Sequence, residues 1–225
     1  MINIQREKPS EEILNILAEE KQKKSGTYRK EEVIQGVIGD FYNKCYLCEI
    51  KEGTSLNIEH FVPHRGNKDL EFHWDNLFLS CYHCNNIKGH MFDNILNPTD
   101  EKEDVENLIK YKMEPFPKSK VEILPLSSDD KVKNTSELLD LVYNGSTALK
   151  VEESHNLKKK LLDDLRDFQN QLYTYYYEEV FHDDVALAKK NIIKHLSKRA
   201  AFTAFKRWII KDNPVFYNDF KEFLD

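Results

Sequence analysis

The sequence predicts an α+β protein in which most of the chain is helical. Two observations carry this prediction. Long stretches in both halves place apolar residues at helical spacing, whereas residues 56–62 alternate between apolar and polar with the period of a strand. The 225 residues, 40% of them hydrophobic, suit one domain or two small ones with a sizeable core.

The N-terminal part begins with a short capped helix. Pro9-Ser10-Glu11-Glu12 precedes apolar positions at helical spacing, and a polar stretch ends the segment near residue 26. Helical spacing resumes over residues 28–43. We therefore expect residues 1–27 to form a helical arm.

Residues 28–112 are predicted to form a compact unit that contains all four cysteines. Residues 56–62 are the candidate strand, with Leu56 and Ile58 inward. A polar loop follows at 63–69, and residues 74–80 lead into the second cysteine pair.

Residues 113–225 are predicted to be a helical region after an irregular start. Three prolines make 113–130 irregular, with one possible strand at 121–124, after a turn at 97–100. Three helices are then expected: one over 136–143, stopped by Asn144-Gly145, a long amphipathic one over 157–176, and another over 185–211.

The four cysteines form two Cys-x-x-Cys pairs, Cys45 with Cys48 and Cys81 with Cys84. In a reducing compartment two such pairs indicate a tetrahedral structural zinc site. A redox dithiol and unrelated buried thiols are the alternatives. Redox motifs seldom occur in twos and no cysteine is left over, so we expect zinc.

Composition excludes several function classes. No apolar run approaches the roughly 20 residues that span a bilayer, and the N-terminus lacks a signal-peptide core, so we expect a cytoplasmic protein without membrane contact. The net charge is −6, from 33 Lys and Arg against 39 Asp and Glu. A site for a polyanion must therefore be a local patch.

A chemically distinctive set of residues lies between and after the cysteine pairs. It comprises Glu59-His60-Phe61-Val62-Pro63, then Asp75-Asn76-Leu77, then Cys84-Asn85-Asn86-Ile87-Lys88-Gly89. In this order and spacing the chain resembles the HNH endonucleases over residues 45–89. The resemblance implies a small ββα core that clasps a catalytic metal and is braced by a four-cysteine zinc site.

The resemblance also assigns roles to individual residues. His60 would be the general base that activates water, Glu59 and Asn85 would hold a divalent cation, and Asn76 would orient the base and its loop. Oxygen ligands of this kind favour Mg²⁺ or Mn²⁺. Two positions depart from the family pattern, because Asn85 stands where many members have His and Glu59 where Asp is frequent.

Each of these residues also has a structural alternative. His60 could be a satisfied core histidine, Glu59 a solvated strand carboxylate, Asn76 a cap, and Asn85 a turn residue. Arg65 and Lys88 could contact DNA phosphate or be ordinary surface charges. We assign no role to the four histidines nearby, His64, His73, His83 and His90, and expect Trp74 and Phe78 in the core.

A narrower resemblance covers residues 65–98. Arg65-Gly66, His73 to Cys81 and Asn97-Pro98 are similar to the PtuB-type HNH nucleases of Septu anti-phage systems and to retron-associated HNH proteins. That resemblance implies a DNA-cleaving effector that acts beside an ATPase of the ABC/SMC type. The alternative is a non-catalytic zinc module that binds nucleic acid or protein.

Residues 186–211 are strongly basic, with eight Lys or Arg and no Asp or Glu. On one continuous helix Lys190, Lys194 and Lys198 would form a stripe able to contact DNA phosphates or an acidic surface of a partner. The alternative is a solvated face balanced by acidic residues of the preceding helix, such as Asp163, Asp164 and Asp167.

Overall fold

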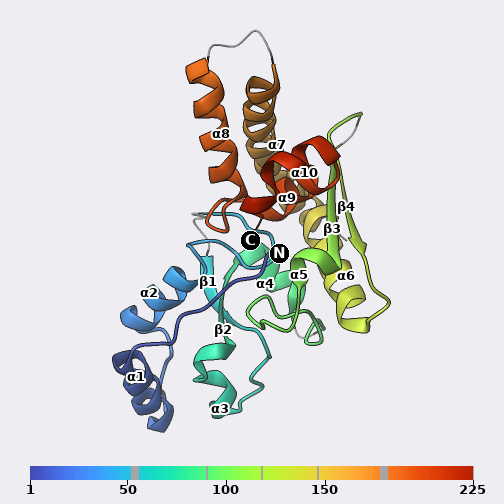
Figure 1. The fold of residues 1–225 in the computed structure, drawn as a ribbon. Helices are drawn as coiled ribbons and strands as arrows, with labels where there is room; N and C mark the ends of the chain where they lie inside the picture. Colours follow the sequence, from blue (N-terminus) through green and yellow to red (C-terminus); the bar gives the residue numbers. More distant parts are fainter. Residues whose placement is uncertain (52–55, 90, 118, 146, 178–181, 225) are drawn as a thin grey trace.

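The computed structural model describes residues 1–51, 56–89, 91–117, 119–145, 147–177 and 182–224 (Figure 1). Two small antiparallel sheets lie among helices, so the predicted, mostly helical α+β class is confirmed. Its α-helices are α1 Glu11–Gln22, α2 Glu31–Asp40, α3 Lys68–Glu71, α4 Tyr82–Lys88, α5 Val105–Leu108, α6 Asp130–Asn144, α7 Ala148–Tyr176, α8 His182–Leu196, α9 Thr203–Lys211 and α10 Pro214–Phe220. The strands are β1 Leu56–His60, β2 Leu77–Cys81, β3 Ile109–Glu114 and β4 Lys120–Pro125, and the 3-10 helices are η1 Trp74–Asn76 and η2 Lys221–Phe223.

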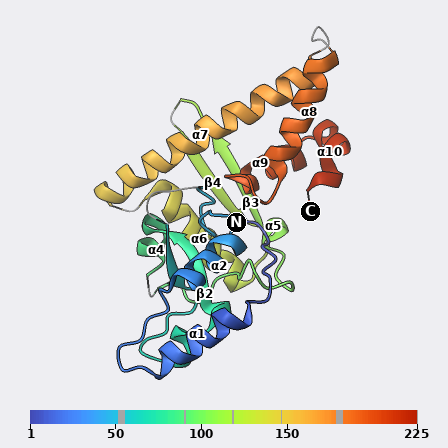
Figure 2. The same ribbon diagram turned by 90° about the vertical axis from the view of Figure 1, so that its left-hand side faces the viewer.

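Helix α1 starts where the sequence indicates. The Ser10 hydroxyl accepts a hydrogen bond from the Ile13 amide and satisfies one of the free amides of the first turn. Helix α2 follows, and its Val33 and Val37 side chains are fully buried. Both helices lie beside the β1–β2 hairpin (Figures 1 and 2).

The β1–β2 hairpin is the frame of the cysteine-bearing unit. The strands pair antiparallel, with Leu56 opposite Cys81 and His60 opposite Leu77. Helix α4 begins at the end of β2 and packs back along both strands, which completes a ββα unit. Aromatic packing fills its interior, because the Phe78 ring lies 4.8 Å from Phe61 and 5.0 Å from Tyr46. The expected burial of Trp74 and Phe78 is confirmed.

The sequence predicted only one of the two strands of the β3–β4 hairpin. Strand β4 covers the expected strand at 121–124, but its partner β3 lies in a segment that the sequence did not mark as a strand. Tyr111 and Ile109 of β3 alternate with polar residues and are buried, so a period of two is present but short. Helix α6 packs against β4.

Helices α6 and α7 both begin before the expected residues. The Asp129 side chain caps α6 by accepting from the Lys131 amide, and Thr147 caps α7 by accepting from the Lys150 amide. The sequence prediction started both helices at later apolar positions, about two turns further along the chain. The stop of α6 is as expected, because Gly145 takes a left-handed φ of 72° at its C-cap.

The expected single helix over 185–211 is wrong. Helix α8 ends at Leu196, a turn follows, and α9 begins at Thr203. Phe202 adopts a left-handed φ of 48° at the start of α9, and its amide donates to the Glu49 carbonyl at 3.3 Å. Phe202 is itself buried, so a tertiary contact interrupts a segment whose local pattern favours one helix.

Helices α7 and α8 form an antiparallel pair, visible in both views (Figures 1 and 2). One large apolar cluster extends from the N-terminal segment through both hairpins to Phe205, and a smaller one joins the end of α7 to α8 and α10. In the described part of the chain no helix combines the length and the apolar character that crossing a membrane requires.

Candidate active site and metal centre

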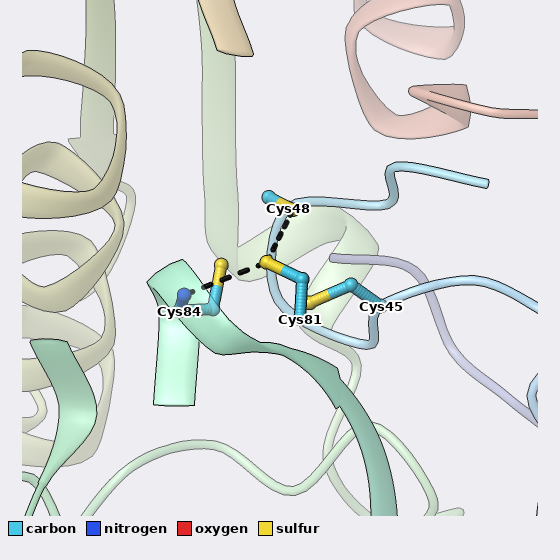
Figure 3. Close-up of side chains that lie close together, drawn as sticks. All are labelled: Cys45, Cys48, Cys81 and Cys84. Atoms are coloured by element: carbon cyan, nitrogen blue, oxygen red, sulfur yellow. Dashed lines mark hydrogen bonds between the residues drawn. The ribbon is translucent and has the colours of Figure 1, made fainter. Parts of the chain in front are cut away.

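Four cysteine thiols converge at one end of the β1–β2 hairpin (Figure 3). Their sulfur atoms all lie within 4.8 Å of one another, and the side chains are buried. The sulfurs of Cys48 and Cys81 are 3.7 Å apart. Four sulfurs at about 2.3 Å from a central zinc are about 3.8 Å from one another, whereas a disulfide needs about 2.05 Å. The cluster therefore fits a tetrahedral metal such as zinc.

Local backbone geometry presents these thiols. Glu49 takes a left-handed φ of 59° and its amide donates to the Cys45 carbonyl at 2.9 Å, which closes the first Cys-x-x-Cys turn. Cys81 ends β2 and caps α4, because its sulfur accepts from the Cys84 amide at 3.5 Å. An amide aimed at a sulfur stabilises the thiolate that metal binding requires.

The other end of the hairpin faces a cleft of about 440 Å³. Of the residues predicted for catalysis, His60, Glu59 and Asn85 all line this cleft. Lys88 and Arg65 line it too. The ββα arrangement explains the convergence, because α4 runs back along the strands from the cysteines toward His60.

His60 is held in one orientation by a backbone carbonyl. Its Nε2 lies 2.9 Å from the Glu71 carbonyl oxygen, which can only accept, so Nε2 carries the proton and donates. The neutral ring then offers Nδ1 as its basic atom. Burial lowers the pKa of His60, and the Glu71 carbonyl opposes this shift. The imidazole is therefore neutral near pH 7, as a general base must be.

Glu59 is a buried carboxylate, 5% exposed, beside that histidine. Its Oε2 lies 3.4 Å from Lys88 Nζ, and the same ammonium donates to the His60 carbonyl at 3.0 Å. Its Oε1 makes no well-formed hydrogen bond to any described residue, although Tyr46 lies near. Burial raises the pKa of Glu59 and the Lys88 ammonium opposes that rise. A buried oxygen without a partner is what a cation would satisfy.

Lys88 itself occupies a position that the sequence did not predict. It is 1% exposed, so its ammonium is neither an ordinary surface charge nor in contact with solvent. It lies between Glu59 and the backbone of His60 as a cation already bound to the carboxylate.

The Asn76 side chain forms its hydrogen bonds with the loop around His60 and not with the His60 imidazole. Its Oδ1 accepts from the Val62 amide at 2.7 Å, and its Nδ2 donates to the carbonyls of Val62 and Leu70 at 2.9 and 3.0 Å. These bonds tie residues 62–70 to η1, next to the carbonyl of Glu71 that orients His60. The side chain is 5% exposed, so every one of its bonds is shielded from water.

Sequence analysis missed two cleft residues, Tyr28 and Tyr82, and named a third, His64, without giving it a role. The Tyr28 ring packs edge-on against His60 at 4.8 Å, and the His64 ring lies 4.6 Å from it. Tyr82, which is 61% exposed, also lines the cleft. Tyr28 lies far from the motif in sequence and only the fold brings it there, whereas His64 and Tyr82 lie inside it without a motif position of their own.

The remaining histidines lie elsewhere or cannot be placed. His83 points to α6 and α7, where Nδ1 lies 2.7 Å from Glu153 and Nε2 2.8 Å from the Val142 carbonyl. His73 is exposed and does not line the cleft. His90 lies outside the described residues.

The predicted basic stripe does not form as one surface. Lys190 and Lys194 are on α8, but Lys198 follows the end of that helix and lines a hollow with Asp100 and Glu101. Other cations of the stretch are buried and paired, Lys206 with Asp164 at 2.7 Å and Arg207 with Glu106. Arg65, exposed at the cleft, pairs with Asp93 at 2.9 Å.

Comparison with known proteins agrees with this geometry. Residues 45–91 match the family model described as HNH endonuclease, and this segment contains the cysteine cluster together with His60, Glu59, Asn76 and Asn85. The Septu protein PtuB of Bacillus thuringiensis is 38% identical over 63 residues, a match covering 25% of this chain and 24% of that protein. The chain thus matches about a quarter of its curated relative's length. No solved structure gives a significant match.

Proposed function

We propose, from the HNH endonuclease segment and the cleft that it builds, that this protein hydrolyses phosphodiester bonds of DNA with the aid of a divalent cation. The observation that carries the proposal is the side-by-side placement of an oriented, neutral His60 and a buried Glu59 oxygen that makes no well-formed hydrogen bond to any described residue. Phosphodiester hydrolysis requires both a base for water and a positive charge beside the phosphate.

In this proposal His60 removes the proton from the attacking water through Nδ1, since Nε2 is committed to the Glu71 carbonyl. Asn76 keeps the loop and therefore that carbonyl in place. Glu59 and Asn85, both oxygen donors lining the cleft, would hold Mg²⁺ or Mn²⁺. When bound there, such an ion stabilises the charge that develops on the phosphate and the departing 3′ oxygen. The products would be 3′-hydroxyl and 5′-phosphate ends.

The four cysteines would hold zinc as a structural ion. They are buried and closed on all sides by protein, whereas a catalytic zinc needs an open coordination position. Zinc would then join the loop before β1 to the end of β2 and so fix the two halves of the motif.

The resemblance to PtuB supports a finer proposal, that the chain is the effector nuclease of an anti-phage defence system and works with an ATPase partner. Co-purification of a stable complex from the native host would support the partner. A lone protein with full activity would contradict it.

The nuclease proposal is tested by the nicking of supercoiled plasmid in Mg²⁺ and in Mn²⁺. His60→Ala should lower the rate about 10²–10⁴-fold, because it removes the base. His73→Ala is the matched control, since His73 is exposed outside the cleft, and it should leave the rate unchanged. Equal cutting by all three proteins would reject His60. Inactivity of the zinc-loaded wild type would favour a partner-gated enzyme or the non-catalytic zinc module.

A further inference from the structure

A second cavity, of about 570 Å³, lies where α7, α8 and the turn at 197–202 meet the segment after the first cysteine pair. It shares no lining residue with the His60 cleft. Its volume is within the range of about 300–1,000 Å³ that small-molecule sites occupy.

The inner wall of this cavity is a chain of paired charges. Lys206 is fully buried, and its Nζ lies 2.7 Å from Asp164 and 3.1 Å from His195 Nδ1. Because the ammonium only donates, Nδ1 accepts, and the opposite ring nitrogen, 3.1 Å from Asp167, donates to that carboxylate. Lys206 is buried, whereas the Asp167 side chain is 64% exposed, and both carboxylates are paired, Asp164 with Lys206 and Asp167 with His195.

Three further cations line the cavity and form no ion pair with any described residue. Lys51, Lys194 and Arg199 line the cavity, and none has a carboxylate within ion-pair distance in the part of the chain that the structure describes. The Arg199 guanidinium lies 5.0 Å from the centre of the Tyr42 ring, which restricts its position. Three such cations lining one cavity favour an anion, and phosphate offers oxygens for several of them at once.

Two side-chain amides lie on the same cavity. Asn191 Nδ2 donates to Gln171 Oε1 at 3.0 Å, which fixes both groups and leaves one amide oxygen and one amide nitrogen for a ligand. An acceptor beside a donor is the combination with which Asn and Gln recognise the edge of a nucleobase.

We propose that this cavity binds a nucleotide, with its phosphate on Lys51, Lys194 and Arg199 and its base beside Asn191 and Gln171. The nucleotide can be free or part of a nucleic-acid strand, since both present the same phosphate and base. The proposal stands apart from the nuclease proposal, because none of its residues belongs to the His60 cleft.

Hydrogen bonds join the turn beside the cavity to the residues that flank the first cysteine pair. Lys44 Nζ donates to the Ala200 carbonyl at 2.9 Å, and the Phe202 amide donates to the Glu49 carbonyl at 3.3 Å. Lys44 and Glu49 flank the first cysteine pair. A nucleotide in the cavity would thus lie against backbone that is hydrogen-bonded to the residues flanking the first cysteine pair.

Calorimetric titration of the full chain with ATP, ADP, pyrophosphate and adenosine tests the site, alongside fluorescence polarisation with a DNA oligonucleotide without added divalent cation. The variant is Lys194→Gln with Arg199→Gln. The matched control is Lys159→Gln with Lys160→Gln, which removes the same charge from exposed positions of α7 outside the cavity. Thermal unfolding of both should equal that of the wild type.

The phosphate ligands should bind at least tenfold more weakly to the cavity variant and within twofold of wild type to the control. ATP that binds and displaces the oligonucleotide identifies a free nucleotide as a ligand of the site. Binding of the oligonucleotide alone, with the slope of log affinity against log salt reduced by about two in the cavity variant, identifies a strand. Absence of any phosphate binding, equal binding of adenosine, or equal losses in both double variants would overturn the proposal.

Discussion

The two ends of the β1–β2 hairpin carry polar clusters of opposite kinds. At the Leu56–Cys81 end four buried sulfurs close on one another. At the His60–Leu77 end, roughly 13 Å away along the strands, nitrogen and oxygen atoms border a cleft. The four sulfurs are soft ligands and form a complete set. The nitrogen and oxygen atoms of the cleft are harder ligands, and Glu59 Oε1 among them makes no well-formed hydrogen bond to a described residue.

We therefore expect the four sulfurs to serve the stability of the fold, and the nitrogen and oxygen atoms of the cleft to serve its chemistry. A closed set of four ligands holds a metal that contributes to folding and leaves no position for a substrate. An incomplete set of ligands leaves a coordination position for a substrate. Without a bound cation, the Lys88 ammonium balances the charge of the Glu59 carboxylate. The comparison predicts that changes at the cysteine end abolish the fold, while changes at the His60 end cost less stability and affect metal binding and rate.

The largest effect is expected for Cys84→Ser. Structural zinc contributes about 10–16 kcal/mol in small zinc domains, so loss of one ligand should remove the metal and unfold the unit around it. Zinc content by mass spectrometry and thermal unfolding by circular dichroism measure both. Ser80→Ala is the control, because Ser80 lies 3.8 Å from the Cys45 sulfur without being a predicted ligand. If the Cys84→Ser protein folds fully without zinc, the cysteine end is not required for folding and the proposed difference between the two ends is wrong.

The next effect concerns Lys88→Met, which removes the ammonium from Glu59. An unpaired buried carboxylate costs about 3 kcal/mol, on the order of 10 °C in the melting temperature of a chain this size. Mn²⁺ should restore more stability to the variant than it adds to the wild type, since it no longer competes with a fixed positive charge. Lys160→Met, at an exposed position on α7, should change neither value. Equal Mn²⁺ effects on variant and wild type would argue against a cation site at Glu59.

Asn76→Asp should have a smaller effect. The change keeps the oxygen that accepts from Val62 but replaces a donor by an acceptor opposite two carbonyls. We expect a loss of about 1–3 kcal/mol in unfolding free energy and slower plasmid nicking with unchanged zinc content. Asn67→Asp is the control, because Asn67 Oδ1 caps α3 by accepting from the Asp69 and Leu70 amides and an Asp oxygen accepts equally well. If Asn76→Asp and Asn67→Asp lower stability and nicking equally, the two hydrogen bonds that Asn76 Nδ2 donates make no contribution.

The smallest effect is the pH dependence of nicking. Burial lowers the pKa of His60 below its usual value of 6.5, and only the neutral ring accepts a proton. The rate should be independent of pH above about 6.5 and should fall up to tenfold per pH unit once the pH is below the His60 pKa. Rates between pH 5 and 8 measure this. A midpoint above 6.5 would contradict a buried neutral base.

The sequence by itself determined the elements whose signal is local. Two Cys-x-x-Cys pairs, a strand of alternating pattern, the Ser10 cap and the Gly145 stop all depend on residues a few positions apart, and the structure has each of them. The HNH motif belongs to the same class, because its spacings are fixed by one hairpin and one helix. The resemblance to HNH endonucleases assigned Glu59, His60 and Asn85 to one site, and all three line one cleft in the structure.

Only the tertiary structure decided which charges are buried and what they contact. Lys88 was equally a phosphate ligand or a surface charge by sequence, and the fold places it on Glu59. The segment 185–211 has the pattern of one helix, but buried Phe202, bonded to the Glu49 carbonyl, breaks it and separates Lys194 from Lys198. Local pattern sets which face of an element is apolar, whereas the free energy of a buried charge depends on partners distant in sequence.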